Sequence, residues 1–140
     1  MTLKLWTDGS ISNKLKKSGW SAIFSKNEKI VEKTFGQCEL TTSANIEIIA
    51  IIEGLKYYKK FLYDNQRLEV YTDAKFIYDV INRNYWKKWD FNNRNINWEI
   101  LKNLIEDLNE NNISFHWIPS HSNFYFNILA DRDAKLSRLL

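Results

Sequence analysis

The sequence has 140 residues, the size of one folded domain with one core. Hydrophobic residues make up 44% of it and aromatic residues 15%, which excludes an intrinsically disordered protein. The net charge of +3 weakly favours a polyanionic partner, and the single cysteine, Cys38, excludes an intramolecular disulfide and a cysteine-rich zinc site.

Three strands are predicted at the start of the chain, over residues 3–8, 19–24 and 29–35. The first alternates in polarity and ends at Gly9-Ser10, as a strand that enters a turn does. The second and third are rich in β-branched and aromatic residues. Because no helix is expected between them, we predict an antiparallel meander.

A long helix is predicted over residues 44–62, where hydrophobic residues recur at helical spacing after the N-cap hydroxyls of Thr41-Thr42-Ser43. A strand over residues 68–72 and helices over residues 75–83 and 96–108 follow. Pro119 ends a strand over residues 113–118, and a helix over residues 127–139 follows it. The order βββαβααβα predicts an α/β fold in which helices flank a five-stranded mixed sheet.

No apolar run is long enough to cross a bilayer, since the longest covers residues 48–52. The first residues also lack the basic start and apolar run of a signal peptide. We therefore expect a cytoplasmic protein that has no membrane partner, is a monomer, and forms a single domain over residues 1–140.

Four acidic residues are candidates for a shared site. Asp8 and Asp73 each follow a predicted strand, Glu47 lies in the first turn of the long helix, and Asp131 begins the last helix. Such a cluster would favour Mg²⁺, or Mn²⁺, because its ligands are all oxygens. Each residue alone can equally be a turn, cap or solvated residue, and the spacing by itself favours that structural interpretation.

The residues themselves resemble those of type 1 ribonuclease H along nearly the whole chain. The similar segments are Thr7-Asp8-Gly9-Ser10, Glu32-Lys33-Thr34-Phe35, Thr41-Thr42, Asn45-Ile46-Glu47, Thr72-Asp73, Trp86-Lys87-Lys88, Trp117-Ile118-Pro119-Ser120-His121-Ser122, Asn127 and Ala130-Asp131.

The resemblance implies a ribonuclease H-like fold and an endonuclease that hydrolyses the RNA strand of RNA–DNA hybrids. It implies hydrolysis with two metal ions per site, leaving 5′-phosphate and 3′-hydroxyl ends. The implied metal ligands are Asp8, Glu47, Asp73 and Asp131. His121 would help product leave or shuttle a proton. The substrate-binding residues carried over are Gly9, Ser10, Thr42, Ser43, Trp86, Lys87, Lys88, Asn95 and Asn127.

Trp86 would offer a flat ring face to deoxyribose, and Thr42 with Asn95 would bind a DNA phosphate. The chain departs from the family in a lysine-rich loop over residues 11–18, and in Ser43 and Ala44, where the family often has Asn or Gln. Three alternatives stay open: a nuclease of this fold with another specificity, a non-catalytic hybrid-binding module, and the excised domain of a reverse transcriptase.

Overall fold

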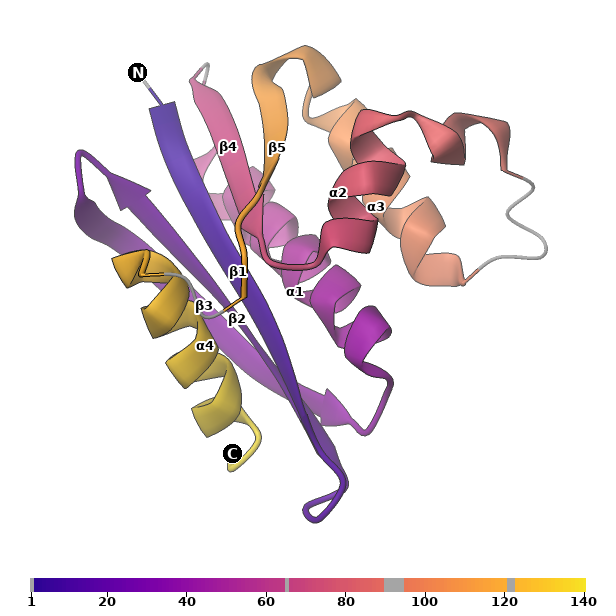
Figure 1. Ribbon diagram of the computed structural model, residues 1–140. Helices are drawn as coiled ribbons and strands as arrows, with labels where there is room; N and C mark the ends of the chain where they lie inside the picture. Colours follow the sequence, from indigo (N-terminus) through magenta and orange to yellow (C-terminus); the bar gives the residue numbers. More distant parts are fainter. Residues whose placement is uncertain (1, 65, 90–94, 121–122) are drawn as a thin grey trace.

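The computed structural model describes residues 2–64, 66–89, 95–120 and 123–140. Five strands form one mixed sheet in the order β3-β2-β1-β4-β5 (Figure 1). Strands β1 (Thr2–Ser12), β2 (Lys17–Lys26) and β3 (Lys29–Glu39) form an antiparallel meander. Strands β4 (Arg67–Thr72) and β5 (Ile113–Trp117) extend it in parallel from β1. The predicted α/β fold and its five-stranded mixed sheet are confirmed.

The two long helices that flank the central strands lie on opposite faces of the sheet (Figure 1). Helix α1 (Ser43–Tyr57) continues into a π-helical turn, η1 (Tyr58–Leu62), and α4 (Tyr125–Ser137) lies on the other face. In the described parts of the chain the remaining helices are α2 (Lys75–Asn82), η2 (Tyr85–Lys88), α3 (Ile96–Asp107) and η4 (Glu110–Asn112). No helix in the described ranges has both the length and the apolar character needed to cross a membrane.

Alternation along β1 divides the core between these two faces. Leu3 and Leu5 pack with residues of α1 and α3 in the larger hydrophobic cluster, whereas Trp6 packs with Leu129 and Ala130 of α4 in the smaller one. This is the expected result of a strand whose successive side chains point to opposite faces. Both faces of β1 are therefore anchored, and the residues that follow Trp6 are held firmly in place.

The meander strands are longer than their hydrophobic pattern predicts. The pairing of β1 with β2 continues to Ser12 opposite Lys17, so residues 11, 12, 17 and 18 of the supposed loop are strand and only residues 13–16 form the turn. Ser18 is buried there, and its hydroxyl accepts a hydrogen bond from the Thr41 amide at 3.0 Å. Main-chain pairing continues past the apolar residues because it does not depend on side-chain polarity, and this corrects the loop expectation.

Helix α4 lies against β2 at a glycine that leaves no room for a side chain. A Cβ atom on Gly19 would collide with the Ala134 carbonyl oxygen and would lie 2.9 Å from the Arg138 amide nitrogen. Both contacts are with backbone atoms, which cannot move aside as a side chain can. The close approach fixes α4, and with it Asp131, against the sheet.

We expect Gly19→Ala to destabilise the protein by roughly 2–3 kcal/mol, since overpacking costs about 1–3 kcal/mol even where side chains can adjust. Thermal unfolding followed by circular dichroism measures the change. Gly54→Ala is the matched control, because its Cβ would meet side-chain atoms of Leu5 and Ala22 at 3.0–3.2 Å. Equal melting temperatures for Gly19→Ala and the parent would contradict the fixed position of α4.

Candidate active site

The parallel pairing of β1 with β4 brings Asp8 and Asp73 together at the carboxyl end of β4. Asp73 directly follows β4, whereas Asp8 lies inside β1, which continues to Ser12. Leu5 pairs with Val70 and Trp6 with Tyr71, and in the same register Asp8 lies level with Asp73. Ligand sites of open α/β sheets lie at this carboxyl edge. The prediction that the two aspartates lie close together is therefore confirmed by the register.

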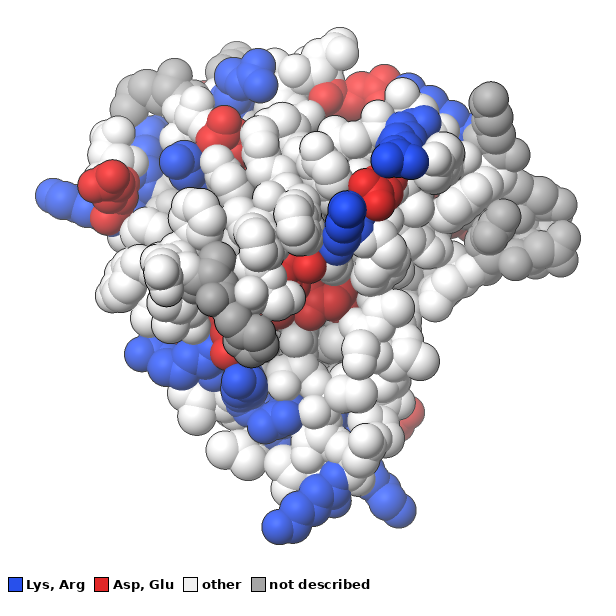
Figure 2. Space-filling view, viewed as in Figure 1, with Lys and Arg blue, Asp and Glu red and all other residues white. Residues whose placement is uncertain are grey.

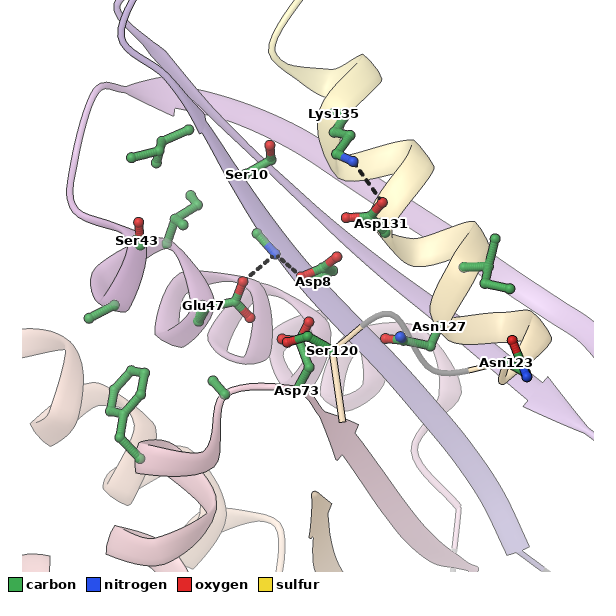
Figure 3. A pocket seen from close by; sticks show the side chains of 17 residues that line it. Asp8, Ser10, Ser43, Glu47, Asp73, Ser120, Asn123, Asn127, Asp131 and Lys135 are labelled. Carbon is green, nitrogen blue, oxygen red and sulfur yellow. Dashed lines mark hydrogen bonds and ion pairs between the residues drawn. The ribbon is translucent and has the colours of Figure 1, made fainter. Parts of the chain in front are cut away.

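Glu47 reaches the same place from α1. The helix begins at Ser43, after Thr42 accepts a hydrogen bond from the Asn45 amide at 3.1 Å, so Glu47 lies in its second turn and not in the first. The Gly9 amide donates to Asp8 Oδ1 at 2.9 Å and to Glu47 Oε1 at 3.0 Å (Figure 3). A Cβ atom on Gly9 would lie 2.8–3.0 Å from atoms of Ile46, so this contact requires glycine.

Asp8, Glu47 and Asp73 form a carboxylate cluster, in which one oxygen of each lies within 4.8 Å of the others. Asp131 is not part of this close group, but it lines the same pocket of about 740 Å³ (Figure 3). Gly9, Ser10, Ser43 and Asn127, all predicted to bind substrate, also line this pocket. On the face shown in Figure 2, acidic side chains lie near the centre, and lysine and arginine side chains lie around them.

Lys135 is a member of this pocket that the sequence interpretation missed. Its Nζ lies 3.0 Å from Asp131 Oδ2, one helical turn away on α4 (Figure 3). The spacing of four residues between an acid and a base on a predicted helix was a signal that could have found this pair. The Lys135 ammonium places a positive charge in the pocket that also holds the three clustered carboxylates.

Burial and electrostatic repulsion make Asp8 and Glu47 difficult to ionise. Burial, followed by the charge of Asp73, raises the pKa of Asp8 from its ordinary value of 3.8 to about 8. Burial, followed by the charges of Asp8 and Asp73, raises the pKa of Glu47 well above its ordinary value. Glu47 Oε2 is buried without a hydrogen-bond partner among the described residues. A set of oxygen ligands with an unpartnered buried oxygen fits a hard divalent cation such as Mg²⁺ or Mn²⁺.

A polar network joins the two residues predicted to bind a DNA phosphate. Asn95 Nδ2 donates to Asn45 Oδ1 at 2.9 Å, and Asn97 Nδ2 donates to the same oxygen at 2.7 Å. Asn45 lies one turn into α1, whose N-cap is Thr42, and Asn95 is the N-cap of α3. The network therefore brings two helix N-termini together, an arrangement suited to anions. The central role of Asn45 was not predicted.

The predicted aromatic contact at Trp86 is wrong in its geometry. Trp86 is only 3% exposed, and its ring packs edge-on against Trp98 with centroids 6.4 Å apart. Large aromatic rings gain more from such packing than from solvent, so its face does not lie open to deoxyribose. Phe76, which was not predicted, is 40% exposed and lines the carboxylate pocket.

Of the other predicted site residues, two are described by the structure and two are not. Lys87 is exposed, and its Nζ lies 3.7 Å from Glu110 Oε2. Asn127 is buried at the start of α4, beside the pocket. His121 and the side chain of Lys88 lie outside the described residues. Their expected roles stay predictions.

The chain is similar to proteins of one family along nearly its full length. The RNase H family model matches residues 1–138. Ribonuclease H of Caldicellulosiruptor saccharolyticus is 35% identical, over 94% of this chain and 92% of its own. Ribonuclease H of Rickettsia bellii is 32% identical, over 96% of this chain and 87% of its own.

Two solved structures have the same fold at low sequence identity. LC11-RNase H1 in complex with an RNA/DNA hybrid has a TM-score of 0.77 at 16% identity, covering 97% of this chain and 96% of that one. RNase H1 of the archaeon Halobacterium salinarum has a TM-score of 0.73 at 16% identity, covering 98% of this chain and 97% of that one.

The raised pKa of Asp8 gives the metal-free protein a defined pH dependence. Between about pH 4 and pH 8 the unfolded chain has released this proton while the folded protein still holds it, so stability falls as the pH rises through that window. We expect Asp8→Asn to remove part of this fall. In EDTA at pH 8 its melting temperature should exceed that of the parent by roughly 4 °C, which corresponds to about 1 kcal/mol for a domain of this size.

Thermal unfolding in EDTA at several pH values provides the measurement, with Asp107→Asn as the control. Asp107 is an exposed carboxylate that pairs with Lys59 at 3.4 Å, away from the cluster. A melting temperature of Asp8→Asn that lies below the parent's at pH 8 would show that Asp8 is a structural cap.

Proposed function

The chain belongs to the ribonuclease H family, and from this premise we propose that it hydrolyses the RNA strand of RNA–DNA hybrids at the carboxylate cluster. The single observation that carries the proposal is the convergence of Asp8, Glu47 and Asp73 from three separate elements, with Asp131 lining the same pocket. A protein that only bound hybrids would gain nothing from buried carboxylates that repel one another. The expectation of a cytoplasmic, single-domain monomer stays a prediction.

Asp8, Glu47, Asp73 and Asp131 would hold two divalent ions, Mg²⁺ or Mn²⁺. When bound, such ions supply positive charge for the attacking water and the leaving oxygen of a phosphodiester. The Gly9 amide keeps Asp8 and Glu47 oriented toward each other, and the partner of Asp131 is the Lys135 ammonium. We further propose that the products carry 5′-phosphate and 3′-hydroxyl ends.

The same pocket offers polar groups to the RNA strand. Gly9, Ser10 and Ser43 line it beside the carboxylates, and hydroxyl and main-chain groups of this kind can bind a 2′-hydroxyl. Asn127 lies buried next to Asp131 and would position that side of the site. We propose that His121 helps product leave or shuttles a proton.

The DNA strand would be bound at the N-termini of α1 and α3, next to the carboxylate pocket. The proposed phosphate site consists of Thr42, Asn95 and the bridging Asn45, at the joined N-termini of α1 and α3. Phe76, half-exposed beside the carboxylate pocket, takes the role first assigned to Trp86, because its ring is open to a sugar. Lys87 is an exposed residue of η2 and would add an electrostatic contact with the nucleic acid backbone, as would Lys88.

We expect the protein to cut the RNA of a hybrid in Mg²⁺ and to lose this activity in EDTA. Asp73→Asn should lower turnover by at least about 10²-fold, the loss that follows removal of one electrostatic group from an active site. Labelled hybrid, double-stranded RNA, double-stranded DNA and single-stranded RNA are compared on gels, with Asp107→Asn as the control. Full activity in EDTA, or equal cutting of double-stranded DNA, would overturn the proposal.

For the DNA strand, we expect the double variant Thr42→Ala/Asn95→Ala to bind hybrid about tenfold more weakly or worse. Hydrogen bonds to charged groups contribute ~1.5–3 kcal/mol each, and this variant removes side-chain bonds of that kind. Fluorescence anisotropy in Ca²⁺ measures binding with little cutting. Asn111→Ala, which changes an exposed residue of η4, is the control. Affinity equal to the parent's would show that the DNA strand is bound elsewhere.

A further inference from the structure

A second pocket, which we call the aromatic pocket, lies on the face of the sheet that α4 covers. It has a volume of about 670 Å³ and lies between the first half of β1, the turn after β2 and the start of α4. The side chains that matter for the argument are Lys4, Trp6, Lys26, Tyr71, Phe124 and Phe126, all of which line it. None of them takes part in the site described above.

The walls of the aromatic pocket are flat rings. Trp6 and Tyr71 are stacked, with centroids 4.3 Å apart and planes 14° apart. Phe124 and Phe126 approach Trp6 from the start of α4, at centroid distances of 6.1 Å and 5.7 Å. Phe124 is 49% exposed, so much of its surface remains open to a ligand. Tyr71 also stacks on His116, with centroids 4.9 Å apart, so Phe124 is the ring that suits a planar ligand such as a nucleobase, since every base can stack on an aromatic face.

Cations lie at this pocket beside the rings. Lys4 Nζ is 5.7 Å from the centroid of the Tyr71 ring, and Lys26 lines the pocket with its Nζ bonded to Gln66 Oε1 at 3.2 Å. Glu28 is the single carboxylate among the described lining residues. Aromatic rings with an excess of lysine favour a ligand that carries both bases and phosphates.

The aromatic pocket adjoins the carboxylate pocket. Alternate residues of β1 point to one face of the sheet and line both pockets. Lys4 and Trp6 line the aromatic pocket, and Asp8 and Ser10 line the carboxylate pocket. The Cα atoms of Trp6 and Asp8 are therefore only roughly 6.8 Å apart along the strand. Asn123 lines one pocket and Phe124 the other, so the start of α4 divides them.

We infer that the aromatic pocket binds unpaired nucleotides of the RNA strand next to the hybrid that occupies the carboxylate pocket. Bases stack on the exposed ring of Phe124, and Lys4 and Lys26 face the phosphates. An RNA strand that leaves the hybrid crosses the start of α4 to reach this pocket. The inference rests on the proposed function, because it requires the hybrid to lie at the carboxylate cluster.

The test compares blunt hybrids with hybrids that carry an overhang of about four nucleotides, the lower limit for single-strand sites. The overhang is placed at the 5′ or 3′ end of the RNA strand, or on the DNA strand. A further probe has abasic sugars in the RNA overhang, which keep the phosphates and remove the bases. Anisotropy in Ca²⁺ gives the affinities, and cleavage of the blunt hybrid in Mg²⁺ is followed separately.

We expect an RNA overhang of one polarity to tighten binding by the parent at least about fivefold, and abasic sugars to remove most of that gain. Phe124→Ala and Lys4→Gln should each reduce the gain while cutting blunt hybrid like the parent. Phe35→Ala is the control, because Phe35 is 52% exposed on β3, outside the aromatic pocket.

Three results would overturn the inference: no gain in affinity from any overhang, a gain in affinity from DNA overhangs alone, or a gain in affinity that the pocket variants retain. An equal loss in Phe35→Ala would also overturn it. A pocket that serves a protein partner gives no overhang dependence. If the parent cuts no blunt hybrid, the proposed function fails, whatever the overhang does; normal cutting without overhang dependence rejects the aromatic pocket alone.

Discussion

The parallel pairing of β1 with β4 holds Asp8 and Asp73 level with each other, so their negative charges repel whenever both are ionised. Glu47 adds to the repulsion from α1, and its orientation is fixed by the Gly9 amide. The fold withstands this because both faces of β1 are packed, by α1 on one side and α4 on the other. The core therefore offsets the strain that the site imposes on the metal-free protein.

Helix α4 organises one whole face of the molecule. Its packing at Gly19 determines where Asp131 and Lys135 lie, and its first turn separates the carboxylate pocket from the aromatic pocket. The hydroxyl of buried Ser21 donates to the Ala130 carbonyl, beside Asp131, which anchors the middle of the helix to β2. One helix thus carries part of the chemistry and also divides the surface along which a nucleic acid strand can run.

The proximity of Asp8 and Asp73 could be predicted because hydrophobic alternation and order along the chain determine the sheet, although β1 continues past Asp8 to Ser12. Strand lengths could not, since the polar ends of β1 and β2 pair through main-chain groups that leave no sequence pattern. The packing of Trp86 could not be predicted, because an aromatic residue among lysines gives the same sequence pattern whether it binds DNA or packs against another ring such as Trp98. Asn45 and Phe76 were missed because their neighbours come from distant segments.

The order of assembly follows from the strand order. The meander β1-β2-β3 forms from neighbouring segments, whereas β4 reaches β1 only when Leu3 pairs with Leu68 and a long loop closes. Contacts of such high sequence separation form slowly, because loop-closure entropy is lost before any contact compensates for it. We therefore expect Asp8 and Asp73 to meet late in folding. A divalent ion bound by both would slow unfolding and leave the rate of meander formation unchanged.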